Sequence, residues 1–378
     1  MHNRTFDYDY LIVGAGFYGT SFARAATDLG KKCLVMDKRG HIAGAAYDIP
    51  CADYYVSEYG AHVFHTNSLK IWDFLSRFTT FKPFIYRPKI RSRGGVFSFP
   101  INLMTLQQLY GIASPAEAEE HLSGVRVNIE NPSNFEDWML SMVGDDLYQR
   151  FYYHYTKKHW LKEPRELPVS IAQRIPIRLT YDENYFITKF QGIPDQGYTN
   201  LVRNMLDGIK VELGAAYSKE YEKMARRVIY TGPIDEYYGY EHGELDFRTL
   251  QFTKEVYSGD KQGNAAINYT DAAPSYIRSV EHRHFYKQGE AIKHYDVGAE
   301  AVPSVVTYDC PVKYEKGMDP FYPIRDKFNS AMYAKYAAIP NDKVSFGGRL
   351  GEYKYLDMDQ SVASALAAVS KFESSMAW

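Results

Sequence analysis

Three glycines near the start of the chain have the GxGxxG spacing of a turn that binds a dinucleotide: Gly14, Gly16 and Gly19. A buried strand is expected before this turn at 8–13, a helix after it at 17–29, and a second strand at 32–36. Glycines allow a pyrophosphate to approach the backbone closely, and the N–H groups at the start of the helix face that anion. Asp37 ends the second strand, where a carboxylate binds ribose hydroxyls and repels a 2′-phosphate. The pattern predicts a dinucleotide site and disfavours NADP.

A second turn of small residues follows at once, from Arg39 to Gly44. Folds of the FAD-binding oxidoreductase type often place such a turn near the pyrophosphate and the ribityl chain. This position favours FAD over NAD as the cofactor.

Composition narrows the class of protein. The net charge of −2 gives no electrostatic footprint for nucleic acid, and 34 tyrosines suit a pocket that needs flat faces and hydroxyls. The three cysteines include no CxxC pair, and no apolar run reaches the length of a membrane span. The histidines lack zinc-site spacing, so no metal is expected. We therefore expect a cytoplasmic protein without a membrane span.

The rest of the chain alternates between helical and strand-like patterns. Helical spacing is expected at 69–79, 103–165 and 359–375, a buried strand at 225–230, and antiparallel strands between about 235 and 315. Ser114, followed by Pro115 and Glu117, has the Ser-x-x-Glu pattern that predicts a helix N-cap. No repeat or low-complexity linker separates these segments, which indicates interwoven domains.

Several sequence blocks, in one order along nearly the whole chain, carry a resemblance to a known family. They are DKRGHIAG at 37–44, YGAHVFHT at 59–66, FSFPINL at 97–103, YTKKHW at 155–160, ELPVSIAQRIPIR at 166–178, YDENYF at 181–186, YTGPIDEYYGY at 230–240, EHRHF at 281–285 and FGGRLGEYKYLDMD at 346–359. With these blocks the chain resembles the bacterial UDP-galactopyranose mutases from about residue 8 to residue 373.

The resemblance implies an α/β fold with a Rossmann-like FAD-binding domain, an inserted helical domain and an antiparallel β-sheet domain. The corresponding ranges are 1–80, 195–235 and 330–378 for FAD binding, 103–180 for the helices, and 81–102, 181–194 and 236–329 for the sheet. It also implies that reduced flavin attacks the anomeric carbon of a UDP-hexose through N5. UDP leaves, and the ring then opens and recloses, which interconverts the pyranose and furanose forms without net redox change.

The family's functional residues map onto this chain position by position. The implied catalytic residues are His62, Arg174 and Arg278, the histidine against the flavin and the arginines on the diphosphate. The implied cofactor-binding residues are Gly14, Gly16, Phe17, Gly19, Asp37, Lys38, Gly44, Ala45, Gly60, His62, Val211, Arg349, Tyr355, Leu356, Asp357 and Met358. The implied substrate-binding residues are Phe151, Tyr152, Tyr155, Thr156, Trp160, Arg174, Tyr185, Arg248, Asn268, Arg278 and Tyr355. His65 is a further candidate for a functional histidine in the same loop as His62. A homodimer is also expected.

The chain departs from the family pattern at a few positions. Ala43 and Ala45 stand where the family has glycine and asparagine, Tyr86 replaces an asparagine, Leu161 a glycine, and Cys310 aligns with a tyrosine that contacts the diphosphate. Three alternatives therefore stay open: the same mechanism on another nucleotide sugar (N-acetylated or deoxy), a flavin oxidoreductase of the amine oxidase type, and a nucleotide-sugar binder without activity.

Overall fold

The start of the chain forms the predicted βαβ unit. It comprises β1 (Tyr8–Val13), α1 (Phe17–Asp28) and β2 (Cys33–Asp37), in a computed structural model that describes residues 6–286 and 303–376. The predicted range 236–329 thus contains sixteen positions, 287–302, that lie outside the described residues. Tyr10, Leu11 and Ile12 of β1 and the hydrophobic side chains of β2 are buried, as expected for central strands of a parallel sheet.

The chain divides into two compact units, and each is built from separated stretches of sequence. Unit 1 comprises residues 1–83, 188–248 and 316–378, and unit 2 comprises residues 84–187 and 249–315. The helical segment and the antiparallel strands expected from the sequence both contribute to unit 2.

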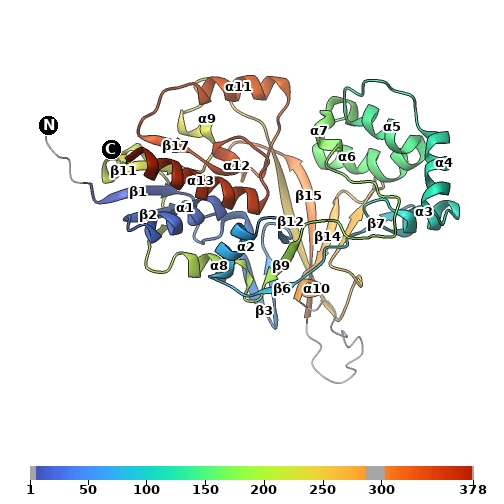
Figure 1. Cartoon of the computed structure of the whole chain (residues 1–378), viewed down its shortest axis with the longest axis horizontal. Helices are drawn as coiled ribbons and strands as arrows, with labels where there is room; N and C mark the ends of the chain where they lie inside the picture. Colours follow the sequence, from blue (N-terminus) through green and yellow to red (C-terminus); the bar gives the residue numbers. More distant parts are fainter. Residues whose placement is uncertain (1–5, 287–302, 377–378) are drawn as a thin grey trace. The chain divides into compact units, whose positions relative to one another are not determined.

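Unit 1 contains a five-stranded sheet in the order β10-β2-β1-β11-β17, and its pairs are parallel. The three further strands are β10 (Lys210–Leu213), β11 (Ala225–Tyr230) and β17 (Val344–Phe346). Helix α13 (Met358–Met376) packs along α1, and both are visible beside the sheet in Figure 1. Phe22, Ala23 and Ala26 of α1 are completely buried in the resulting core. This arrangement presents the turn after β1 at the carboxyl edge of the sheet, where ligands bind in such folds.

Smaller elements complete unit 1. An antiparallel pair is formed by β3 (Asp48–Cys51) and β4 (Tyr54–Ser57), and a three-stranded sheet by β5 (Phe64–Thr66), β9 (Phe190–Pro194) and β6 (Phe81–Pro83). The helical segments are η1 (Gly44–Ala46), α2 (Leu69–Ser76), α8 (Gly197–Met205), η4 (Lys219–Met224), α9 (Ile234–Tyr237), α11 (Lys327–Ala337) and α12 (Gly348–Gly351). The short strand β16 (Tyr322–Pro323) pairs with the first residues of β12 (Phe247–Ser258).

Unit 2 contains a group of helices around one hydrophobic core (Figure 1). They are α3 (Leu103–Tyr110), α4 (Pro115–Val125), α5 (Phe135–Tyr148), a π-helical turn η2 (Gln149–Tyr153), α6 (His154–Trp160), η3 (Pro164–Glu166) and α7 (Val169–Ala172). The predicted N-cap is confirmed, because the Ser114 hydroxyl accepts the Glu117 N–H and the Glu117 carboxylate accepts the Ser114 N–H. Such a capping box satisfies N–H groups that a helix start otherwise leaves unpaired.

The strands of unit 2 follow the order β12-β15-β14-β13-β7-β8. They include β7 (Lys89–Ser92), β8 (Gly95–Ser98), β13 (Ala266–Tyr269), β14 (Arg278–Glu281) and β15 (Pro303–Lys313), and the short helix α10 (Arg283–Tyr286) follows β14. The pairs β7–β8, β13–β14 and β14–β15 are antiparallel, whereas β13 and β7 run parallel. The expected antiparallel sheet is therefore present, with one parallel pair between segments far apart in sequence.

Across the two described stretches of chain, we find no helix that is both long enough and apolar enough to cross a membrane.

Candidate functional site

The glycine turn of unit 1 is held by backbone contacts at the edge of the parallel sheet. The Gly14 N–H donates to the Met36 carbonyl (2.7 Å), and the Ala15 N–H donates to Asp37 Oδ2 (2.8 Å). The other Asp37 oxygen accepts the Arg39 N–H (2.9 Å). Each carboxylate oxygen has a second lone pair, so Asp37 can order both turns and still accept ribose hydroxyls.

Close approach explains why this turn requires glycine. Gly14 has a φ of +111°, and a Cβ on it would lie 1.9 Å from Thr231 Oγ1. A Cβ on Gly19 would lie 2.0 Å from the Gly14 carbonyl oxygen, and one on Gly44 would lie 3.0 Å from the Gly16 Cα. The two small-residue turns therefore meet backbone to backbone. Helix α1 has Gly16 at its N-cap without a side-chain cap, so its first N–H groups are available to an anion.

Ala43 adopts a left-handed backbone conformation that favours glycine. Its φ is +71°, its side chain is buried, and its N–H donates to the Ala15 carbonyl (2.9 Å). A non-glycine residue in this region is strained by roughly 1–2 kcal/mol. The departure from glycine at this position thus strains the turn beside the predicted pyrophosphate site.

The turn at Gly347 and Gly348 packs against α1. A Cβ on Gly347 would lie 2.2 Å from the Tyr18 ring, and Gly348 has a φ of +76°. The small residues of this turn leave room for the buried Tyr18 ring, and Tyr18 lies within the GxGxxG motif.

Three predicted residues of unit 1 surround a tyrosine that the sequence analysis missed. Tyr322 stacks on Tyr355 with ring centroids 4.8 Å apart, and the guanidinium groups of Arg248 and Arg349 lie 4.8 and 5.3 Å from its ring centroid. Arg248 is buried, whereas Tyr355 is exposed. Two cations on one aromatic ring make a positive surface that suits an anionic ligand. Only the β12–β16 register, which pairs Arg248 with Tyr322, could have identified this tyrosine.

The two histidines of the YGAHVFHT block have different environments. His62 Nδ1 lies 2.8 Å from the Gly60 carbonyl, which can only accept, so Nδ1 carries a proton and the neutral imidazole has its lone pair on Nε2. Gly60 has a φ of +88°, a conformation that favours glycine. His65 lies on β5, and burial lowers its pKa while the carboxylates of Asp357 and Asp359 oppose that decrease.

The remaining predicted cofactor residues are distributed over unit 1. Phe17 and Met358 belong to one hydrophobic cluster, whereas Val211 on β10 packs against the cluster under the parallel sheet. Ala45 lies in η1, Lys38 is exposed directly after β2, and Leu356 and Asp357 are half-buried before α13.

Unit 2 joins helix α6 to the end of β13. The Tyr155 hydroxyl donates to Asn268 Oδ1 (3.4 Å), and Lys158 Nζ donates to the carbonyls of Tyr269, Pro274 and Tyr276 at 2.9, 2.8 and 3.3 Å. Burial lowers the pKa of Lys158 to about 8. Two predicted nucleotide contacts, Tyr155 and Asn268, therefore lie together, and Lys158 orders the loop beside them.

Arg278 is held by an acidic partner that the sequence analysis missed. Its Nε and one terminal nitrogen both donate to Asp309 Oδ2, at 2.7 and 2.6 Å, and Asp309 is fully buried. Burial raises the pKa of the Tyr86 phenol, while the hydrogen-bonded Arg278 guanidinium opposes that increase. The Tyr86 ring contacts Tyr185 (5.6 Å) and Phe186 (5.9 Å). One edge of the guanidinium is thus used by Asp309, and the cluster brings together Tyr86, Tyr185 and Arg278.

The other predicted substrate residues of unit 2 differ in exposure. Phe151, Tyr152 and Thr156 are buried in or beside the core of the helical group, with Phe151 edge-on to Phe97. Trp160 ends α6 and is partly exposed, and Arg174 is exposed just after α7. Two of the departures from the family pattern are Leu161 and Cys310. Leu161 is exposed and has a φ of +53°, whereas Cys310 lies half-buried on β15.

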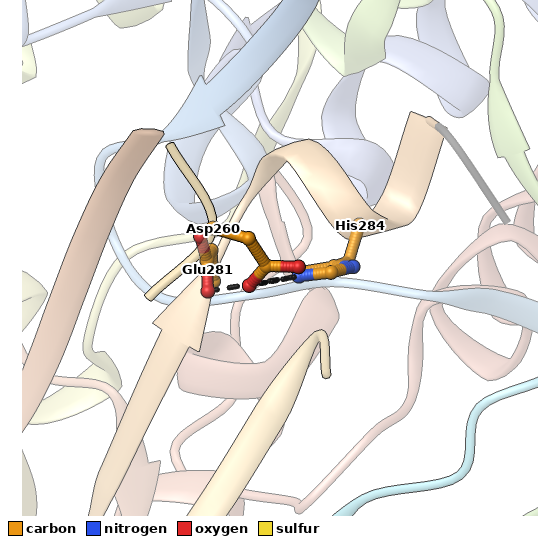
Figure 2. A group of neighbouring side chains, drawn as sticks. All are labelled: Asp260, Glu281 and His284. Carbon is orange, nitrogen blue, oxygen red and sulfur yellow. Dashed lines mark hydrogen bonds and ion pairs between the residues drawn. The ribbon is translucent and has the colours of Figure 1, made fainter. Parts of the chain in front are cut away.

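One further group of side chains in unit 2 has the composition of a metal site. The ligand atoms of Asp260, Glu281 and His284 lie within 4.8 Å of one another (Figure 2). Their oxygens already accept backbone N–H groups from Lys261, Gln262 and Gly263, and His284 Nε2 lies 3.1 Å from Asp260 Oδ1. Hydrogen bonds and charge from both carboxylates raise the pKa of His284, although burial opposes this. His284 balances the charge of the carboxylates when it is protonated, and the three side chains then form an ion-pair network.

Comparisons with known proteins identify the family. Residues 150–355 match the family described as UDP-galactopyranose mutase, and residues 12–78 match the NAD(P)-binding Rossmann-like domain. A protein of Klebsiella pneumoniae named "Probable UDP-galactopyranose mutase" is 38% identical, covering 97% of this chain and 95% of that protein. The chain belongs to the UDP-galactopyranose mutase family.

Two further relatives of this mutase-family chain bear on fold and specificity. A dTDP-fucopyranose mutase of Escherichia coli is 37% identical, covering 94% of this chain and 96% of that protein. The crystal structure of a reduced UDP-galactopyranose mutase superposes with a TM-score of 0.76 at 13% identity, covering 98% of this chain and 96% of that chain. The predicted family, its isomerase class and the Rossmann-like α/β fold are thereby confirmed.

Proposed function

We propose that this chain is an FAD-dependent nucleotide-sugar mutase that interconverts UDP-galactopyranose and UDP-galactofuranose. The observation that carries the proposal is the joint presence of a glycine-built dinucleotide cradle in unit 1 and a tyrosine–asparagine–arginine cluster in unit 2. The family membership supports the same reaction class.

The residues of unit 1 fit FAD. Gly14, Gly19 and Gly44 let the two turns pack closely, the start of α1 has no side-chain cap in the way of a pyrophosphate, and Asp37 is oriented for ribose hydroxyls. Reduced flavin would supply a nucleophilic N5 for the anomeric carbon, which oxidised flavin lacks. His62 would accept or donate a proton at Nε2, because Nδ1 is bonded to Gly60.

The residues of unit 2 suit the nucleoside diphosphate. Tyr155, Tyr185, Asn268 and Trp160 would bind the nucleoside, and Arg174 and Arg278 would hold the diphosphate. Guanidinium is the preferred partner of such an anion because it forms paired, charge-assisted hydrogen bonds. Asp309 fixes the orientation of the Arg278 guanidinium, and a fixed orientation favours directed hydrogen bonds to a phosphate.

The test is incubation of dithionite-reduced protein with UDP-galactofuranose, followed by chromatography. We expect a yellow protein on purification, conversion to UDP-galactopyranose by the reduced protein, and none by the oxidised protein in air. Equal turnover by both forms would exclude the proposed use of reduced flavin. Bleaching of the oxidised flavin by an amine substrate would instead support an oxidoreductase.

A second candidate is the same reaction on a dTDP-linked deoxyhexose. The E. coli dTDP-fucopyranose mutase is nearly as similar to this chain as the Klebsiella relative. Parallel assays with the two furanose substrates decide between the candidates through the ratio of their kcat/KM values. Measured molar mass in solution tests the expected homodimer.

A further inference from the structure

A buried tyrosine in unit 1 touches both predicted flavin-site segments. Tyr198, in the first turn of α8, is 2% exposed. Its ring lies edge-on to Phe17 at 6.0 Å and to His62 at 6.2 Å. Its hydroxyl donates to the His62 backbone carbonyl over 3.2 Å. Tyr198 therefore contacts the main chain of His62 as well as its ring.

The position of Tyr198 is fixed by a buried carboxylate. Asp48 Oδ2 accepts the Tyr198 N–H (2.7 Å), and Asp48 Oδ1 accepts the Thr199 N–H (2.9 Å). The Thr199 hydroxyl donates to the Asp48 carbonyl (2.7 Å) and accepts the Asp48 N–H (2.9 Å). These four bonds join the start of α8 to β3, so the backbone of Tyr198 has little freedom to move.

Gly197 makes this junction possible. Its φ is +77°, and a Cβ on it would lie 2.8 Å from both Asp48 Oδ2 and the Tyr55 ring. Any larger residue would therefore displace the carboxylate that holds Tyr198. The position of Tyr198 thus depends on three residues: Asp48, Gly197 and Thr199.

His62 needs such support because no regular element contains it. It lies in the irregular segment between β4 and β5. The Gly60 carbonyl orients its ring, and the Tyr198 hydroxyl holds its carbonyl. Burial, with the charge of Asp48, raises the pKa of Tyr198 well above its ordinary value, so this hydroxyl keeps its proton and remains a donor.

We propose that Tyr198 is a positioning residue that sets the place of the His62 imidazole in the flavin site. This inference rests on the proposed function, which assigns His62 to the flavin. Tyr198 acts through His62, and through Phe17 at the start of α1, and does not itself react.

The experiment compares Tyr198→Phe with wild type in the full-length, flavin-loaded protein. We expect the flavin absorption spectrum and reduction equilibrium to shift in the same direction as in His62→Gln. Turnover should fall on the order of 10-fold at nearly unchanged KM, because a small misplacement of a catalytic group lowers kcat. Combining Tyr198→Phe with His62→Gln should add little to the His62→Gln effect.

Tyr336→Phe is the matched control. Tyr336 is also fully buried in unit 1, and its hydroxyl donates to the Gly243 carbonyl (2.7 Å) and accepts the His242 N–H (2.9 Å). This control should lower stability similarly and leave the flavin signals unchanged. Thr199→Val removes hydrogen bonds to Asp48 without altering the Tyr198 side chain, and it should shift the flavin signals less and in the same direction. This variant replaces Tyr198→Phe if Tyr198→Phe does not fold.

Wild-type flavin signals in both Tyr198→Phe and Thr199→Val, or fully additive effects with His62→Gln, would overturn the proposal. A wild-type protein that binds flavin but does not isomerise nucleotide sugars would contradict only the proposed function, because the spectroscopic comparison would still report on His62. A wild-type protein that binds no flavin would overturn both.

Discussion

The two candidate binding regions are built by different means. In unit 1 the dinucleotide cradle consists mainly of backbone, with Gly14, Gly19 and Gly44 making room and one carboxylate, Asp37, holding two turns. In unit 2 the nucleotide cluster consists of side chains, with Tyr155 bonded to Asn268 and Arg278 bonded to a buried acid. A backbone site should tolerate no added atoms, whereas a side-chain site should respond to changes in charge and hydrogen bonding.

The largest expected effect is in unit 1. Gly14→Ala should abolish flavin retention and destabilise the fold by about 2–5 kcal/mol, because the new Cβ meets Thr231 and the φ of +111° is strained. Flavin absorbance after gel filtration and chemical unfolding measure these losses. The control is Gly30→Ala, at a φ of +78° with no heavy atom within 4 Å, which should lose only roughly 1–2 kcal/mol and keep its flavin. Retention of flavin by Gly14→Ala would contradict the backbone-built cradle.

The next effect separates two arginines of unit 2. Arg174→Ala and Arg278→Ala should each lower kcat/KM by roughly 30- to 1000-fold, equivalent to about 2–4 kcal/mol of lost diphosphate contact. Only Arg278→Ala should also destabilise the protein, by about 3–5 kcal/mol, because it leaves the buried Asp309 without its counter-charge. Exposed Arg174 should change the free energy of unfolding by no more than about 0.5 kcal/mol.

Steady-state kinetics and urea unfolding on the same samples separate these two consequences. Arg278→Lys is the informative control, since it keeps the charge and loses the paired geometry. Near-normal kinetics in both alanine variants would mean that the diphosphate binds elsewhere.

A smaller effect concerns pH and the ion-pair network of unit 2. Partners raise the pKa of His284 above its ordinary 6.5, and they lower that of Asp260 below 3.8 despite burial. The contribution of His284 to the free energy of unfolding is complete below pH 6.5 and is lost as pH rises through its folded-state pKa. The contribution of Asp260 is instead lost as pH falls below 3.8. His284→Gln should therefore lower stability by about 1.5–3 kcal/mol near pH 5.5 and by less at about pH 8.5.

Thermal or urea unfolding of wild type and His284→Gln at both pH values checks this prediction. A difference that grows with increasing pH would contradict the assignment of a protonated histidine between Asp260 and Glu281 (Figure 2).

The smallest expected effect is a gain in stability. Ala43→Gly should stabilise unit 1 by about 0.5–1 kcal/mol, because release of the left-handed strain exceeds the added entropy of the unfolded glycine. Ala46→Gly, in the same segment but without a positive φ of its own, should instead destabilise, and unfolding midpoints distinguish the two. A loss of stability in Ala43→Gly would show that the surrounding turn has adapted to alanine.

The same contrast explains which residues the sequence could predict. The spacing of Gly14, Gly16 and Gly19, with Asp37 after the next strand, is a local signal, and the structure has the expected βαβ unit there. Asp309 and Tyr322 carry no local signal, because their partners lie 31 and 74 positions away along the chain. Tyr198 likewise depends on Asp48, which is 150 positions distant. Such residues become visible only when strand register and tertiary packing are known.

The interleaved order of the two units has a consequence for synthesis on the ribosome. Unit 2 is complete at residue 315, whereas unit 1 still lacks β17, the turn that receives Tyr18, and α13, which covers Phe22 and Ala26 of α1. The apolar face of α1 therefore stays uncovered until the ribosome has synthesised β17 and α13. A nascent chain stalled after residue 315 should bind chaperones through α1 and retain no flavin, and cofactor capture should follow only after release of the finished chain.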